Sequence, residues 1–231
     1  PTPAMRLGTA FHVATLEPRN FDESWARGSE LSGRTKEGKI ARAELEEQYD
    51  FDKILKPDDY DTVCAMRDRV LGHPVAGPLL GWWSTQFLGD GGVRTEVAAF
   101  WTDEESGIEC KAKIDGLPFD GDYLIDLKST VDASPEHMAK AIHNFGYYRQ
   151  AAHYLSPFDD RDRFLIIACE KKAPFALAVY EVAPAAIRRG SLEVRSLLLE
   201  WARCIDDLGW DAAWPSYPEE ITELGLPPWV L

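Results

Sequence analysis

The chain has 231 residues, of which 45% are hydrophobic and 11% aromatic, and its formal net charge is −14. This length and composition allow one large domain or two small ones with a sizeable core, and they exclude a disordered chain. The acidic balance argues against a protein that coats nucleic acid non-specifically, because phosphate contacts need a basic surface, but it allows an enzyme with a local basic groove.

The four cysteines, Cys64, Cys110, Cys169 and Cys204, lie far apart and include no C-x-x-C pair. This spacing indicates neither a disulfide framework nor a zinc ribbon or iron–sulfur cluster. No apolar run approaches the ~20 residues of a membrane span, and the first residues show no signal-peptide pattern. We therefore expect a cytoplasmic protein with reduced thiols and no membrane contact. The start, Pro-Thr-Pro directly before a helical pattern, suggests a fragment of a longer chain.

In chain order, the first half is predicted to be helical. An apolar stripe predicts a helix over residues 4–17 that contains His12 and ends at Pro18. The polar stretch 19–35 is expected to be a loop. Further helices are predicted over residues 36–49, 57–71 and 75–82.

The centre of the chain is predicted to be a sheet. Strands are expected over residues 93–102, 111–117, 123–128, 163–169 and 175–182. Helices are expected over residues 134–145, 146–155 and about 184–207. The fold class is therefore α/β, with a central mixed sheet flanked by helices. We expect one domain, with a helical N-terminal part about 1–85, a core about 86–207 and a tail 208–231, rich in Pro and Trp, that wraps the surface.

The stretch from residue 111 to residue 130 carries the candidate chemistry. Its two strands, joined by a turn, bring Asp115 and Asp126 to one end of the sheet, with Lys128 two residues further on. Two carboxylates with an ammonium group are typical of a site for a hard divalent cation and the water that it activates. The alternative is an ordinary hairpin face, in which Lys128 alone offsets the desolvation of Asp126 in its apolar strand.

Four motifs, in this order, resemble the PD-(D/E)XK nuclease superfamily, and within it the exonuclease VIII (RecE-type) and phage lambda-exonuclease-like group. They occupy residues 7–18, 114–116, 125–130 and 150–154. Ile114 replaces the proline usual before the first acid, and the second acid is Asp126 rather than Glu; both are variants of the pattern. The resemblance implies a restriction-endonuclease-like core within a single nuclease domain.

The resemblance implies a role for each residue of the candidate site. Asp115 and Asp126 would bind the metal together with the Leu127 carbonyl oxygen, and His12 would be a further ligand, unless it is a core histidine. The ion would be Mg²⁺, with Mn²⁺ as a substitute that imidazole favours. Lys128 would lie beside the attacking water and stabilise charge on the phosphate.

Other candidate residues surround this centre. Glu96 is expected to bind the metal through water or to hold Lys128, with a plain buried ion pair as the alternative. Gln150 and Tyr154, spaced i and i+4, would orient the lysine or contact DNA, although Tyr154 could be a core aromatic. Three side chains are candidate contacts to DNA phosphates, with an ordinary solvated charge run as the alternative for the basic ones: Arg34, Lys36 and Thr130.

The activity that the resemblance implies is 5′→3′ degradation of one strand at double-stranded DNA ends, in phage-type recombination. The implied partners are DNA ends, a single-strand annealing protein and further copies of the chain in a trimeric or tetrameric ring. Two other functions stay open: a structure-specific endonuclease on the same fold, and a non-catalytic recombination module. The presence of His12, Asp115, Asp126 and Lys128 argues against the last.

Overall fold

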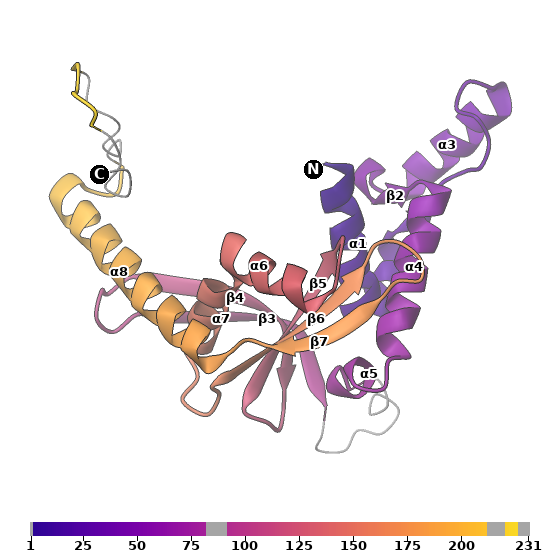
Figure 1. The fold of residues 1–231 in the computed structure, drawn as a ribbon. Coiled ribbons are helices and arrows are strands. Elements are labelled where there is room, and N and C mark those ends of the chain that lie inside the picture. The colour runs from indigo at the N-terminus through magenta and orange to yellow at the C-terminus, as the bar shows by residue number, and fades with distance from the viewer. Residues whose placement is uncertain (1, 82–91, 212–219, 226–231) are drawn as a thin grey trace.

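A five-stranded mixed sheet forms the centre of the protein, in a computed structural model that describes residues 2–81, 92–211 and 220–225 (Figure 1). Along the sheet the strands are β3 (Val93–Thr102), β4 (Glu109–Pro118), β5 (Tyr123–Thr130), β6 (Arg163–Glu170) and β7 (Leu177–Glu181). The β5–β6 pair is parallel and the other pairs are antiparallel. A parallel pair needs a crossover, which the helices between β5 and β6 supply.

The N-terminal helices cover one face of the sheet. The elements of this part are α1 (Pro3–Leu16), α2 (Pro18–Ser24), β1 (Ala26–Arg27), α3 (Lys36–Gln48), η1 (Phe51–Lys53), β2 (Ile54–Leu55), α4 (Pro57–Leu71) and α5 (Ala76–Leu79). Phe11 of α1 and Met66 of α4 are fully buried against Ile125 and Leu127 of β5. This packing fixes α1, and with it His12, beside the middle of the sheet.

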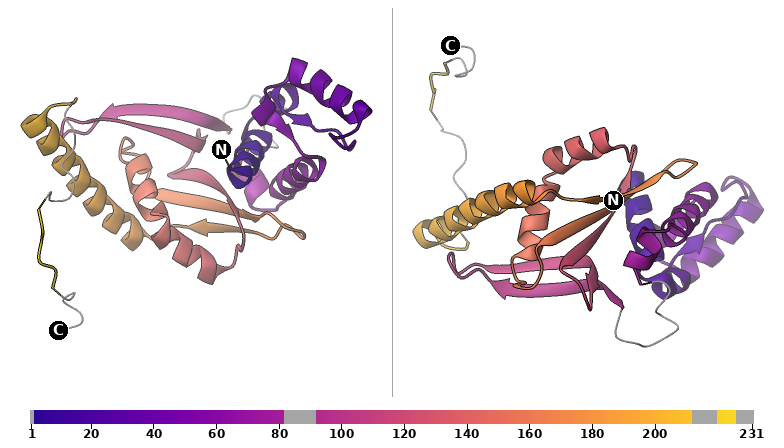
Figure 2. Two further views of the ribbon diagram at one scale, coloured as in Figure 1. Left: turned by 90° about the horizontal axis from the view of Figure 1, so that it is seen from above. Right: turned by 60° about the horizontal axis from the view of Figure 1, so that its bottom comes forward.

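The opposite face is covered by α6 (Pro135–Asn144), α7 (Tyr147–Leu155) and α8 (Pro184–Leu208). Leu124 of β5 and Ile114 of β4 pack here with Met138 of α6 and Ala151 of α7. Figure 2 shows α8 extending beyond the sheet on one side, while the N-terminal helices lie on the other. Burial on both faces explains the apolar character of β5 and β6.

The α/β class and the predicted strands and long helices are confirmed, with ends within about two residues. The expectation of a loop over residues 19–35 is wrong in part, because Pro18 begins α2 and the fully buried Phe21 anchors it. Ala26 and Arg27 also pair with β2 as a short parallel strand. The predicted helix over residues 75–82 is shorter, and its last residue lies outside the described ranges.

Beyond α8 the tail is described over residues 209–211 and 220–225, which form neither helix nor strand. Ile221 and Leu224 are almost fully exposed, so the expected wrapping of the surface is wrong for these residues. The rest of the tail beyond residue 211 lies outside the described ranges. Within the described residues, no helix combines the length and the apolar character needed to cross a bilayer.

The contact between α7 and α8 yields a test of the fold. A Cβ added at Gly190 would overlap the carbonyl oxygen of Tyr148 and lie 3.1 Å from the Cβ of Ala152. We expect Gly190→Ala to lower the free energy of unfolding by about 2 kcal/mol, because the overlap outweighs the helical preference for alanine. Denaturant unfolding measures the change. Gly33→Ala, with open space around the new methyl group, is the control; equal stability of both variants would contradict the packing.

Candidate metal centre

The centre begins where β4 and β5 separate. The two strands are paired at Gly116 and Ile125, and the next residue outward on β4 is Asp115. The Oδ2 atom of Asp115 accepts a hydrogen bond from the amide of Leu127 on β5, at 2.8 Å. A side-chain carboxylate thus satisfies a backbone donor at this fork. The position of Asp115 is therefore determined by the backbone of the neighbouring strand.

Asp126 reaches the same fork from the other face of the sheet. It alternates with Ile125 and Leu127 along β5, so it shares the α6 and α7 side with Leu124, and its exposed fraction is 2%. Its Oδ1 accepts hydrogen bonds from Gln150 Nε2 at 2.6 Å and from Lys128 Nζ at 2.9 Å. Its Oδ2 lies 2.7 Å from Lys128 Nζ and makes an ion pair with it, without a hydrogen bond.

Lys128 is held as an ammonium group beside this carboxylate. Desolvation lowers its pKa, but the attraction of Asp126 and the hydrogen bond to it outweigh that effect, so the pKa is raised. Its Nζ also lies 4.8 Å from the centre of the Tyr147 ring, a cation–π contact. The lysine charge is therefore fixed by Asp126 on one side and by an aromatic face on the other.

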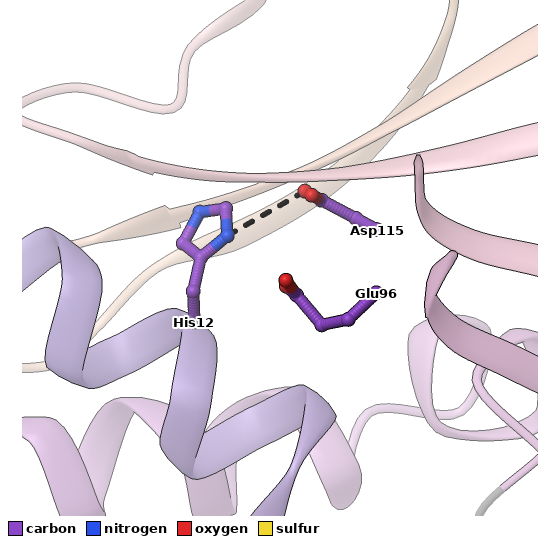
Figure 3. Close-up of side chains that lie close together, drawn as sticks. All are labelled: His12, Glu96 and Asp115. Atoms are coloured by element: carbon purple, nitrogen blue, oxygen red, sulfur yellow. Dashed lines mark ion pairs between the residues drawn. The ribbon is translucent and has the colours of Figure 1, made fainter. Parts of the chain in front are cut away.

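His12, Glu96 and Asp115 form a compact group on the α1 side, which Figure 3 shows in close-up. One ligand atom from each lies within 4.8 Å of the others, and His12 Nδ1 is 3.6 Å from Asp115 Oδ2. Burial lowers the pKa of His12, which favours the neutral imidazole that binds metals. A cavity of about 540 Å³ opens beside the group and is also lined by Gly8 and Thr9.

Glu96 occupies an unusual backbone position in β3. It lies between the pairs Thr95–Gly116 and Val97–Ile114, and so stands opposite Asp115. Its φ angle is 56°, in the left-handed region that glycine favours. Its side chain, 12% exposed, forms an ion pair with Lys113. Strained backbone of this kind gathers at functional sites, where surrounding structure maintains it.

The charges of this centre fit a divalent cation. Burial raises the pKa of both Asp115 and Asp126 to about 6, because the charged forms lose water. The Leu127 amide opposes the shift at Asp115, and Lys128 opposes it at Asp126. Asp126 Oδ2 still lacks a hydrogen-bond donor. Neighbouring hydrogen bonds and charges thus offset only part of the hydration that the two carboxylates lose. Such carboxylates together with an imidazole form a set of oxygen and nitrogen ligands that suits Mg²⁺ or Mn²⁺.

Most of the predicted centre is brought together, with changed partners. Asp115 groups with His12 and Glu96, whereas Asp126 is held by Lys128 and Gln150. The expectation that Glu96 holds Lys128 is wrong, because Glu96 pairs with Lys113. Gln150 acts on the lysine through Asp126, because its amide and the lysine ammonium group donate to the same Asp126 oxygen.

The remaining predicted residues contribute no group to the ion pairs of the centre, although Tyr154 adjoins it through Gln150 and the charges of Asp126 and Asp115. Tyr154 is a half-buried aromatic of the core, edge-on to Phe164 at 6.3 Å. The Thr130 hydroxyl is engaged with the backbone of Asp132. Arg34 and Lys36 precede and begin α3, which lies on the outer side of the N-terminal helices in Figures 1 and 2. A role of these basic residues in DNA binding stays a prediction.

Two neighbours were missing from the predicted site. Lys113 lines the same cavity as Asp115, and its position two residues earlier on the same strand face was a signal for it. Tyr147 lies against Lys128, but it comes from the start of α7, and no sequence spacing connects it to β5. Both are placed by contacts between separate elements.

Comparisons with known proteins show what the chain is similar to. The model of a family described as a PDDEXK-like domain of unknown function (DUF3799) matches residues 1–222. A crystal structure described as a "putative exonuclease" from Eubacterium rectale is similar at 12% identity and a TM-score of 0.49, over 82% of this chain and 71% of that one. The crystal structure of SSO0001 is similar at 17% identity and a TM-score of 0.29, over 46% and 50%. No curated protein matches the sequence.

The Lys113–Glu96 ion pair competes with a cation for the same carboxylate. We expect Lys113→Met to raise the affinity for Mn²⁺ by up to about fivefold, because the exposed lysine no longer pairs with Glu96. Calorimetric titration measures this affinity. Lys111→Met, an exposed lysine two residues away, is the matched control and should bind Mn²⁺ like the wild type. Unchanged or weaker binding by the Lys113 variant would exclude Glu96 from the cation site.

Proposed function

The chain belongs to the family of PDDEXK-like domains within the PD-(D/E)XK nuclease superfamily, and we propose that it is a metal-dependent deoxyribonuclease. The observation that carries the proposal is the fork between β4 and β5. There Asp115 is fixed by the Leu127 amide, beside His12, and Asp126 is paired with Lys128. Acids, imidazole and an ammonium group at one break in a sheet supply both a cation site and a group that stabilises phosphate charge.

The residues for the cation come from four elements. Asp115, His12 and Glu96 would hold it on the α1 side, and Asp126, paired with Lys128, offers a further carboxylate oxygen at the fork. We propose Mg²⁺ as the ion, with Mn²⁺ as a substitute that the imidazole favours. When bound, such an ion lowers the pKa of a water molecule and neutralises charge on the phosphate oxygens.

Lys128 supplies the second function of the centre. Its ammonium group, kept protonated by Asp126, donates hydrogen bonds to the phosphate as negative charge builds on it in the transition state. Gln150 and the Tyr147 ring hold Asp126 and Lys128, so little reorganisation is needed when a substrate arrives. The imidazole of His12 stays neutral beside Asp115 and leaves its lone pair available.

The substrate that we propose is the end of double-stranded DNA, degraded 5′→3′ in phage-type recombination. Support comes from the resemblance of the motifs to the RecE-type group. We further propose a trimeric or tetrameric ring of copies around DNA and a single-strand annealing protein as partner. A ring would let a small basic channel coexist with an exterior whose net charge is −14 per chain.

A nuclease assay tests the proposed function. Linear duplex DNA should be degraded in Mg²⁺ or Mn²⁺ while covalently closed circles stay intact, and EDTA should stop the reaction. We expect Lys128→Ala to lower the rate by about 10²–10³, the usual loss of one charge-stabilising group, whereas Lys111→Ala retains it. Cleavage of closed circles would favour an endonuclease, and no cleavage by the wild type would indicate a non-catalytic module.

The raised pKa of Asp115 and Asp126 predicts how cation binding depends on pH. Each carboxyl must lose its proton to bind, and burial places both pKa values at about 6. Affinity for Mn²⁺ should therefore be level above pH 7 and fall by at least about tenfold per pH unit below 6. Calorimetry across this range measures it, with circular dichroism as the control for folding. Affinity that is unchanged between pH 7 and pH 5 would contradict buried acids as ligands.

A further inference from the structure

A second cavity adjoins Lys128 on the opposite face from His12. It measures about 390 Å³ and lies between the end of β5 and α6; we call it the α6 pocket. Its lining includes Lys128, Tyr147 and Lys171, the buried Met138 and the exposed Phe145. Because Lys128 lines this pocket, a ligand in it would lie next to the phosphate at the proposed reaction centre.

Phe145 gives the pocket an exposed aromatic wall. It follows the last residue of α6 and is 70% exposed. Gly146, at φ 68°, turns the chain at once into α7, a left-handed conformation that suits glycine. The Phe145 ring lies 5.7 Å from that of Tyr147, which in turn contacts Lys128. Aromatic surface is therefore continuous from the reacting lysine to the outside of the protein.

The charge of the α6 pocket is opposite to that of the whole chain. Lys128, Lys140, Lys171 and His137 line it, and none of its lining residues among the described ones is acidic. Lys128 is paired with Asp126 and Lys140 with Glu136, whereas Lys171 forms no ion pair within the described residues. A cationic pocket with an aromatic wall, in a chain of net charge −14, is the combination that binds a phosphate and a nucleobase together.

We propose that the α6 pocket holds one nucleotide of the cleaved strand, with its base stacked on Phe145 and its phosphate facing Lys171. This inference rests on the proposed nuclease function, since it places the nucleotide directly beside the scissile phosphate. The amide of Asn144, also in the lining, can accept or donate hydrogen bonds to any base edge. Stacking tolerates every base, so the pocket would serve a nuclease without sequence preference.

Binding without cleavage tests the pocket. In EDTA, the full chain is titrated with a short single-stranded oligonucleotide and with thymidine 5′-monophosphate, and fluorescence anisotropy and calorimetry give the dissociation constants. We expect Phe145→Ala to weaken binding of the oligonucleotide about tenfold. Phe100→Ala, which removes a 76% exposed phenylalanine from β3, should leave it unchanged. Both side chains are exposed, so both variants should fold.

An abasic oligonucleotide isolates the stacking contact. If the base stacks on Phe145, an abasic unit at the stacked position should weaken binding to the wild type as much as Phe145→Ala weakens binding of the intact strand. Combining the abasic strand with the Phe145→Ala variant should weaken binding little further. Lys171→Gln should reduce the slope of the logarithm of the binding constant against the logarithm of the salt concentration by about 0.7. The same substitution at the exposed neighbour Lys172 should leave this slope unchanged. An effect of Phe145→Ala that is absent, or is equal on intact and abasic strands, would overturn the proposal.

Comparing the oligonucleotide with thymidine 5′-monophosphate distinguishes two sources of the bound nucleotide. Binding of thymidine 5′-monophosphate that Phe145→Ala weakens identifies the released product as occupant, and binding of the oligonucleotide alone identifies the continuing strand; both support the pocket. Cleavage of linear DNA with no effect at Phe145 would refute the pocket and leave the nuclease intact. Stacking at Phe145 without any cleavage would refute the nuclease and leave a nucleotide-binding site.

Discussion

The hydrogen bond from the Leu127 amide to Asp115 is the contact on which the rest of the site depends. It replaces backbone pairing where β4 and β5 separate, and the gap lets acids from the two faces of the sheet approach each other. Asp115 then meets His12 and Glu96 on the α1 side, while Asp126 meets Lys128 and Gln150 on the α7 side. A closed ladder would keep the two carboxylates on opposite faces, apart.

Burial of these charges is costly, and the surrounding contacts offset only part of the cost. Asp126 is 2% exposed and keeps an ammonium group as its partner, because an unpaired buried carboxylate would be protonated instead. The raised pKa values of Asp115 and Asp126 show that the compensation is incomplete. An added divalent cation would remove this imbalance. The same surroundings that destabilise the carboxylates would therefore favour binding of a metal ion.

The sequence predicted the elements better than the contacts between them. The predicted strands bring Asp115, Asp126 and Lys128 to one end of the sheet, and the structure confirms this. The sequence left a buried ion pair open for Glu96, but it did not identify Lys113 as the partner, because Glu96 takes a positive φ angle that its residue type does not signal. Proline at residue 18 was treated as a helix end, although the same ring favours the first turn of the next helix.

Contacts between distant elements set the limit of such prediction. Tyr147 comes to Lys128 only because α6 and α7 pack on β5, and the α6 pocket exists for the same reason.

The anomalous scattering of manganese in a crystal of the protein soaked in Mn²⁺ above pH 7 tests the account most directly. The account predicts one strong peak at the fork, in contact with Asp115 and His12. A peak elsewhere, or none at the fork, would contradict it.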